Sequence, residues 1–379
     1  MGYATRAGHR AMDELAWEEA ARHFEEALRA LERSGAANPI ERCDLLLELG
    51  RALYPAGNRD RYRQAFLEAG QLARRCMDAE RLAKAAIAFS GSQAAGFSDE
   101  QATHLLEEAL QALGPAETSR RAELLAQLAF VLRSGNQIER ADALLAEASE
   151  LAQRLDDARV QAHVALVRGY LLLGRAHPRE MLEICDEITR LAELANEGSR
   201  GFSSNARMWR MSAFLSLGEL ARADAEAARM AEDARWSRLI PSVLAHYQVM
   251  KALLAGRFDD AERLIDEAAV LARRTGDPSD LHKLAAQTLM LRREQGRLSE
   301  IEPVLRAWVE QHPEIPAWRC VLADLFATLG RSQDARREFE GLAASEFAVL
   351  PRSDTQWLIS LVLLAEVCVI LEDERRAEV

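Results

Sequence analysis

The feature that most constrains the fold is a short stripe of residues that recurs along the chain. In the segment LLAGRFDDAERLIDEAAVLARR, residues 253 to 274, Gly256 separates two amphipathic patterns, and Ala261, Ile265 and Ala268 follow it at spacings of four and three. These spacings place the three side chains on one face of a helix. A small residue on either side of a large one predicts that two helices pack closely at this face.

The same stripe is found from one end of the chain to the other. Its other occurrences are Ala20, Phe24 and Ala27; Tyr62, Phe66 and Ala69; Ala102, Leu106 and Ala109; Ala141, Leu145 and Ala148; Met181, Cys185 and Ile188; Ala223, Ala227 and Met230; Ile301, Leu305 and Trp308; and Ala335, Phe339 and Leu342. Successive first members lie 34 to 42 residues apart, which is the period of a helix-turn-helix repeat. The predicted fold class is an all-α, right-handed α-solenoid of about nine such repeats plus an incomplete terminal repeat.

The domain organisation follows from the unbroken repeat. No low-complexity linker divides the 379 residues, so residues 1–379 are predicted to form a single continuous superhelix with degenerate repeats. Longer connectors are expected near residues 91–99 and 195–204. The last repeat, residues 355–379, is expected to be incomplete.

The amino-acid composition indicates a helical fold and a cellular compartment. The chain is 49% hydrophobic and rich in Ala, Leu, Glu and Arg, which are mostly good helix formers. The longest apolar run, residues 357–371, is too short for a transmembrane helix, and no apolar leader is visible at the N-terminus. Five widely spaced cysteines suggest buried thiols in a reducing compartment. A cytoplasmic localisation is therefore predicted.

One repeat carries a closer resemblance. In LGRALYPAGNRDRYRQAFLEA, residues 49–69, the positions of Leu49, Gly50, Leu53, Phe66 and Ala69 resemble the tetratricopeptide repeat (TPR), a pair of antiparallel helices with a small residue in the first helix and a large one in the second. Several other repeats lack the early Trp and sometimes the Gly. The resemblance implies a helical scaffold with a concave groove.

Four longer strings are similar to a narrower group. They are AWEEAARHFEEALRALE at 16–32, LRREQGRLSEIEPVLRAW at 291–308, PAWRCVLADLFATLGR at 316–331 and LPRSDTQWLISLVLLAEVCVILED at 350–373. They resemble the C-terminal helical region of large bacterial ATP-binding LuxR-type regulators and cyclase-ATPase fusion proteins. The resemblance implies a regulatory role, as an arm of a signalling or transcription regulator.

The chemistry-bearing residues form no catalytic or metal signature. The only lysines, Lys84, Lys251 and Lys283, are not preceded by glycine, which excludes a Walker A motif. No His pair has zinc-ligand spacing, and the carboxylates alternate with arginines at helical spacing, as on solvated faces. We therefore expect no enzyme, no metal and no cofactor; an active site assembled from distant helices is the remaining enzymatic alternative. A net charge of −12 argues against a nucleic-acid or anionic-membrane partner.

The predicted working surface is the concave groove, which the first helix of each TPR lines at repeat positions 2, 5, 9 and 12. Transfer of these positions gives the candidate residues Arg133, His163, Tyr170, Asn205, Met208, His246, Met250, Lys283, Met290 and Arg293. This mixture of aromatic, thioether and basic groups suits a peptide or a partner domain. The alternative is a small-molecule sensor that binds a metabolite where Tyr170, Met208, Trp209 and His246 are projected to cluster.

The end of the chain carries a separate prediction. The apolar helix near residues 357–371 runs into VCVILEDERRAEV and would leave one face uncovered, because each repeat contacts only its neighbours. The chain is therefore expected to be a truncated product or an excised segment. The residues around Leu358, Leu361 and Leu364 are expected to form an exposed patch, a homodimer contact or a frayed end.

Overall fold

The computed structural model describes residues 2–35, 38–91, 99–134, 137–173, 177–195, 200–234, 239–275, 278–313, 315–344, 347, 350 and 355–373. Within these ranges every regular element is a helix. The helices are α1 (Gly2–Asp13), α2 (Trp17–Arg33), α3 (Pro39–Leu53), α4 (Arg59–Arg75), α5 (Ala79–Ser90), α6 (Glu100–Leu113), α7 (Ser119–Ser134), α8 (Ile138–Leu155), α9 (Ala158–Leu172), α10 (Pro178–Leu194), α11 (Arg200–Ser216), α12 (Leu220–Glu232), α13 (Leu239–Leu254), α14 (Phe258–Thr275), α15 (Pro278–Glu294), η2 (Leu298–Glu300), α16 (Glu302–Gln311), α17 (Pro316–Thr328), α18 (Ser332–Ala343) and α19 (Thr355–Ile370).

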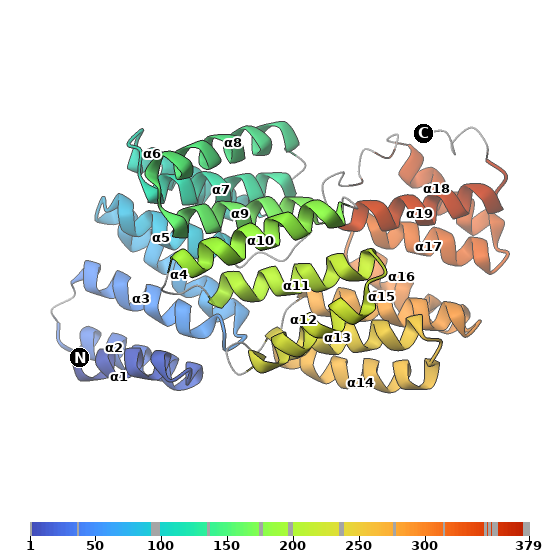
Figure 1. The fold of residues 1–379 in the computed structure, drawn as a ribbon, viewed down its shortest axis with the longest axis horizontal. Helices are drawn as coiled ribbons and strands as arrows, with labels where there is room; N and C mark the ends of the chain where they lie inside the picture. Colours follow the sequence, from blue (N-terminus) through green and yellow to red (C-terminus); the bar gives the residue numbers. More distant parts are fainter. Residues whose placement is uncertain are drawn as a thin grey trace. The chain divides into compact units, whose positions relative to one another are not determined.

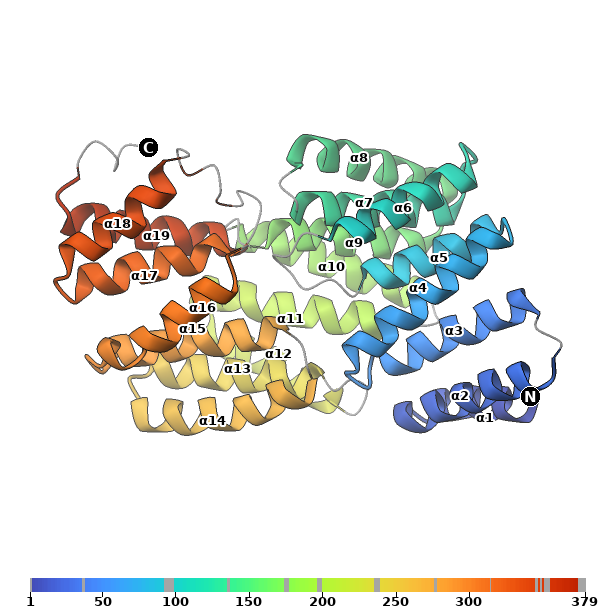
Figure 2. The same ribbon diagram turned by 180° about the vertical axis from the view of Figure 1, so that it is seen from behind.

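The helices follow one another as hairpins. The blue-to-green part of Figures 1 and 2 shows α1 to α10 as successive antiparallel pairs, and each pair packs against the next: α2 on α3, α4 on α5, α6 on α7 and α8 on α9. The odd-numbered helices also contact one another, α5 with α7 and α7 with α9. Contacts pair α1 with α2, α3 with α4, and so on to α11 with α12, and α17 with α18; in the described ranges eighteen α-helices precede α19. The predicted fold class, an α-solenoid of about nine TPR-like repeats, is confirmed.

The stripes lie where the helices meet. Ala20, Phe24 and Ala27 have no exposed surface, and Ala335 and Phe339 are equally buried. Glycine in the first helix of the pair makes this close approach possible: a Cβ atom on Gly8 would lie 2.8 Å from a ring carbon of Phe24. The same relation holds between Gly50 and Phe66, sixteen residues apart in both repeats.

One stripe differs from the rest. Ile301 lies at the end of the 3₁₀-helix η2 and is only half-buried, as is Trp308. The helix α16 begins only at Glu302, with Pro303 in its first turn. Proline lacks an amide to donate within the helix and is favoured at this position, so the stripe is split between two helix types.

The second of the two predicted connectors is shorter than expected. Residues 92–98 of the first lie outside the described residues, and α6 begins at Glu100. The second was predicted to run to residue 204, but α11 already begins at Arg200. Gly201 and the serines that suggested a loop are part of this helix, where the Asn205 side chain donates to the Gly201 carbonyl at 2.9 Å.

Two compact units can be distinguished. Unit 1 comprises residues 1–172, 177–245 and 268–281, and unit 2 comprises residues 173–176, 246–267 and 282–379. The boundaries pass through α13, α14 and α15. The single continuous superhelix stays a prediction.

The last helix occupies the place of a first helix in a tenth pair. Within unit 2, α19 packs mainly on α17, and in unit 1 α9 likewise contacts α7, the first helix of the preceding pair. Leu358 and Leu361 are 38% and 40% exposed, as expected, but Leu364 is only 6% exposed. The expectation for Leu364 was wrong, because this residue is buried with Leu363 and Val367 on the helix that packs on α17. Residues 374–379 lie outside the described part, and the homodimer through this helix stays a prediction.

None of the helices in the described ranges combines the length and the apolar character needed to cross a bilayer.

The Gly50–Phe66 contact gives a stability test. We predict that Gly50→Ala destabilises the chain by about 1–3 kcal/mol, because the new methyl group overlaps the Phe66 ring and overpacking outweighs the better helix propensity of alanine. The measurement is urea unfolding followed by far-UV circular dichroism. The matched control is Gly201→Ala, also within a helix but with nothing near its Cβ position, which should stabilise by about 0.5–1 kcal/mol. Equal effects of the two substitutions would contradict the packing account.

Candidate functional site

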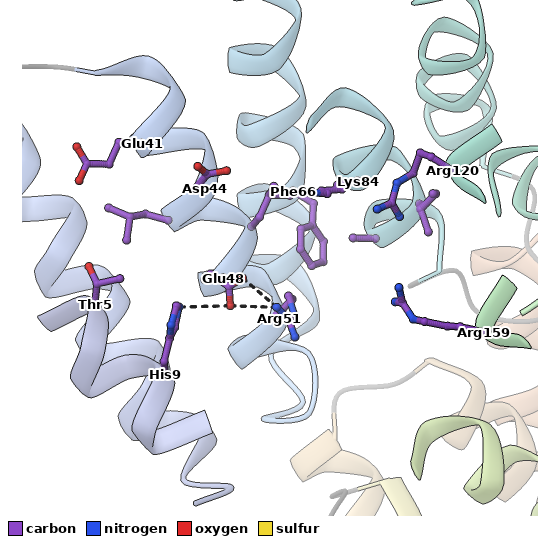
Figure 3. A pocket seen from close by; sticks show the side chains of 14 residues that line it. Thr5, His9, Glu41, Asp44, Glu48, Arg51, Phe66, Lys84, Arg120 and Arg159 are labelled. Carbon is purple, nitrogen blue, oxygen red and sulfur yellow. Dashed lines mark hydrogen bonds and ion pairs between the residues drawn. The ribbon is translucent and has the colours of Figure 1, made fainter. Parts of the chain in front are cut away.

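The structure contains an open cavity of about 590 Å³ within unit 1 (Figure 3). Apart from Phe66 on α4, its lining comes from first helices of five successive pairs, α1, α3, α5, α7 and α9. We call this cavity the N-terminal groove. Its lining residues are Thr5, His9, Glu41, Asp44, Leu45, Leu47, Glu48, Arg51, Phe66, Lys84, Ile87, Ala88, Arg120 and Arg159.

The middle of the groove is apolar. Phe66 reaches it from the second helix of its pair through the space that Gly50 leaves open, and its ring is almost fully buried. Leu45 on α3 and Ile87 and Ala88 on α5 complete this apolar part. Because these side chains belong to the packed core of unit 1, the middle of the groove is preformed.

One side of the groove is acidic and belongs to α3. Asp44 accepts two hydrogen bonds from Arg81, from Nε and Nη2, both at 2.8 Å. Glu48 pairs with Arg51 at 2.9 Å, and His9 Nε2 lies 3.9 Å from the same carboxylate. Glu41, in the first turn of α3, has no ion pair within the described part of the chain.

The other side is basic. Figure 3 shows Arg120 and Arg159 across Phe66 from Glu41 and Glu48. Arg120 donates to Glu80 at 3.1 Å and also pairs with the buried Glu123, and Lys84 Nζ lies 3.8 Å from Glu80. Arg159 is exposed and has no side-chain ion pair among the residues that the structure describes.

The charged side chains of the groove can bind a ligand through ion pairs and hydrogen bonds. In the described ranges no group of three or more His, Cys, Asp or Glu side chains is placed to hold a metal ion. The nearest thiol, Cys43 on α3, donates to the Ala69 carbonyl at 3.3 Å, and burial raises its pKa to about 11. A thiol that stays protonated at neutral pH is a poor nucleophile.

The sequence-predicted residues lie elsewhere, and none of the ten lines the N-terminal groove. In unit 1, Tyr170 on α9 donates to Asn205 Oδ1 on α11 at 3.2 Å. The Tyr170 ring packs edge-on against Trp209, with the centroids 4.8 Å apart. Met208 is half-buried on the same helix. Tyr170 and Asn205 are thus the one predicted pair in unit 1 that the structure joins by a hydrogen bond between described side chains.

Arg133 and His163 are turned into the protein. Arg133 is 2% exposed and its Nη1 donates to Asp142 of α8 at 2.6 Å, so its guanidinium holds two helices of one pair together. His163 on α9 is half-buried with its Nε2 shielded from solvent. Desolvation lowers the pKa of His163, so burial favours its neutral form.

Five predicted residues belong to unit 2. His246 on α13 contacts Gln287 of α15 through Nδ1 at 2.9 Å, and the Gln287 amide donates back to the His246 carbonyl at 2.8 Å. Met250 is half-buried, and Lys283 and Met290 on α15 are exposed. Neither these side chains nor the fifth, Arg293, line the N-terminal groove.

Arg293 takes part in a charge cluster around the buried carboxyl of Asp324. Its guanidinium donates to Asp324 of α17 at 3.3 Å and to Glu366 of α19 at 2.5 Å. Asp324 is 2% exposed. Desolvation raises the pKa of Asp324 to about 6, against the attraction of Arg293. The cluster therefore joins three first helices of unit 2, and the Arg293 guanidinium is engaged with two carboxylates.

The groove residues could have been found from the repeat register. If Gly8 and Gly50 stand at repeat position 8, positions 5 and 9 of the first repeat are Thr5 and His9. In the second repeat, positions 2, 5 and 9 are Asp44, Leu47 and Arg51. All five line the N-terminal groove. The register was applied only from the fourth repeat onward, so these residues were missed.

Comparison with known proteins gives distant structural similarity only. No protein-family model and no curated protein matches the chain. Over 99% of its length it is similar to the crystal structure of the APC/C hetero-tetramer Cut9–Hcn1, with 17% identity and a TM-score of 0.47, and it spans 64% of that chain. It is also similar to a Rap protein complexed with competence and sporulation factor (14% identity, TM-score 0.47, 92% of this chain and 98% of that one). Yeast Tom70 is a third (14% identity, TM-score 0.44, 99% and 81%). Since all three TM-scores are below 0.5, the fold description rests on the helix pairing itself.

The buried carboxyl of Asp324 predicts a pH effect. A carboxyl whose pKa is raised in the native state contributes stability that is fully present below its ordinary pKa of 3.8 and is lost as the pH rises through about 6. Relative to Asp324→Asn, the wild type should therefore gain stability when the pH is lowered from about 7 to about 5. Urea unfolding at both pH values measures this difference. Asp259→Asn, at an exposed site of α14, is the control. The prediction would be contradicted if the difference in unfolding free energy between wild type and Asp324→Asn did not change with pH.

Proposed function

We propose that this chain is a non-catalytic partner-binding scaffold that holds an extended segment of another protein in the N-terminal groove. The observation that carries the proposal is the groove itself: a preformed cavity of about 590 Å³ on the first-helix side of five successive pairs. A groove with an apolar centre and charged side chains along its edges is typical of surfaces that bind peptides.

The dimensions favour an extended segment. Neighbouring packed helices lie roughly 8–10 Å apart, so the three steps from α3 to α9 span at most roughly 24–30 Å. An extended chain covers about 3.3 Å per residue, and a segment of about seven to nine residues would reach from one side to the other. The half-buried side chains of Ile87 and Ala88 would then meet its central side chains.

The role as an arm of a larger regulator is a finer proposal. It is supported by the resemblance of the four strings at 16–32, 291–308, 316–331 and 350–373 to the helical regions of LuxR-type regulators and cyclase-ATPase fusions. In this setting, occupation of the groove would bias the equilibrium between two states of the larger protein. Cytoplasmic localisation belongs to the same proposal.

The metabolite sensor is less well supported. Trp209, one of the side chains projected to surround a metabolite, is 1% exposed and packs directly on Gly169 and Tyr170. The space that a small molecule would need in unit 1 next to Tyr170 is thus filled by the indole ring. A large, specific rise of the melting temperature in a metabolite screen would favour the sensor.

Selection from a phage-displayed library of random peptides tests the proposed function. We predict that selected peptides bind the chain and that Ala88→Phe, which places a ring in the groove, weakens their binding by at least about tenfold, or about 1.4 kcal/mol. Fluorescence anisotropy with the labelled peptides gives the dissociation constants. Ala146→Phe is the control, because Ala146 is exposed on α8, a second helix outside the groove.

Circular dichroism must show that both variants remain folded. Failure of the selection, or peptides that bind wild type and Ala88→Phe equally, would overturn the proposal.

A further inference from the structure

The charges that line the N-terminal groove are not evenly distributed. Glu41, Asp44 and Glu48 all belong to α3, whereas Lys84, Arg120 and Arg159 belong to α5, α7 and α9. Figure 3 shows the labelled carboxylates on one side of Phe66 and the guanidinium groups of Arg120 and Arg159 on the other. The groove therefore changes sign from one side to the other.

Internal ion pairs reduce this polarity but do not remove it. Arg81 offsets Asp44, and Arg51 offsets Glu48. On the basic side, Glu80 and Glu123 offset Arg120, and Glu80 also faces Lys84. The charges left without an ion pair among the described lining residues are the carboxylate of Glu41 and the guanidinium of Arg159.

These two charges are placed to meet a ligand. Glu41 is half-buried in the first turn of α3, and Arg159 is exposed in the first turn of α9. The amides of Arg159 and Val160 already donate to Asp157, at 3.0 and 3.3 Å, so an anion at this end would be bound by the guanidinium and not by free helix amides. Since α5 and α7 come between α3 and α9, the two ends are separated by the apolar middle of the groove.

We propose that the N-terminal groove selects its partner segment by charge order, with a basic side chain of the segment at Glu41 on α3 and an acidic side chain at Arg159 on α9, about seven to nine residues apart. This inference rests on the proposed function, because it specifies the chemistry of the segment that the groove would hold. Complementary charges at the two ends would fix the direction of the segment and exclude segments with one sign of charge throughout.

Three fluorescein-labelled peptides of about ten residues provide the probes. They share an apolar centre of Leu and Ala and differ in their ends: two Lys and two Glu at opposite ends, Glu at both ends, or Lys at both ends. Fluorescence anisotropy at low ionic strength gives the dissociation constants. Wild type is expected to prefer the peptide with opposite ends over the Glu-ended peptide by roughly three- to tenfold, and added salt should reduce this preference.

Charge reversal should exchange the preferences. Arg159→Glu is expected to weaken the binding of the peptide with oppositely charged ends by roughly three- to tenfold and to shift the preference toward the peptide with Lys at both ends. Glu41→Arg should shift the preference toward Glu at both ends. The controls are Arg179→Glu and Glu193→Arg on α10, which change the net charge equally at exposed positions away from the groove. They measure how far the net charge of −12 by itself attracts basic peptides, so that this contribution can be subtracted.

The outcomes separate the two proposals. If the end charges make no difference, or if the α10 controls shift the preferences as much as the groove variants, the charge order is overturned, while binding that Ala88→Phe abolishes would leave the proposed function standing. If none of the three peptides binds, the charge order is overturned, and the proposed function is decided by the phage selection. If binding survives Ala88→Phe, both proposals are overturned. Reciprocal shifts in Arg159→Glu and Glu41→Arg alone support the charge order.

Discussion

The close approach of two helices at a small residue is the contact on which the rest of this structure depends. Where Gly50 faces Phe66 and Gly8 faces Phe24, no Cβ atom separates the helices, and the large ring fills the space that remains. Dispersion and burial of such rings supply the main stabilisation of each pair. The contact within a pair buries the apolar surface of only one side of its helices, so the next pair must cover the apolar surface on the other side. Repetition of this step produces the array of helix pairs.

The N-terminal groove is a consequence of the same contact. The large residues of the stripe belong to the second helices. The first helices of successive pairs lie next to one another, and the side of each first helix that faces away from the stripe can carry polar residues. In unit 1 this side carries carboxylates on α3 and basic groups on α5, α7 and α9. Phe66 contributes both to helix packing and to the groove, since the ring that packs on Gly50 also lines the groove.

Local patterns made the fold predictable and left the site largely unpredicted. The stripe placed every second helix correctly except at Ile301, where Pro303 moves the helix start. Side-chain partners were not predictable, because they depend on residues far apart in the sequence. Arg293 is occupied by Asp324 and Glu366, 31 and 73 residues away, and Arg133 is turned inward to Asp142. Leu364 was expected to be exposed, and only its register against α17 shows that it is buried.

The central claim is that a partner segment lies along the first-helix side of α3, α5, α7 and α9. Amide hydrogen exchange of the whole chain, measured by mass spectrometry with and without a bound peptide, tests it most directly, because protection by a ligand maps to the residues that it covers. The account predicts slower exchange in α3 and α5 and in the first turns of α7 and α9, with α17, α18 and α19 unchanged. Protection confined to α17, α18 and α19, or to the second helices of unit 1, would contradict it.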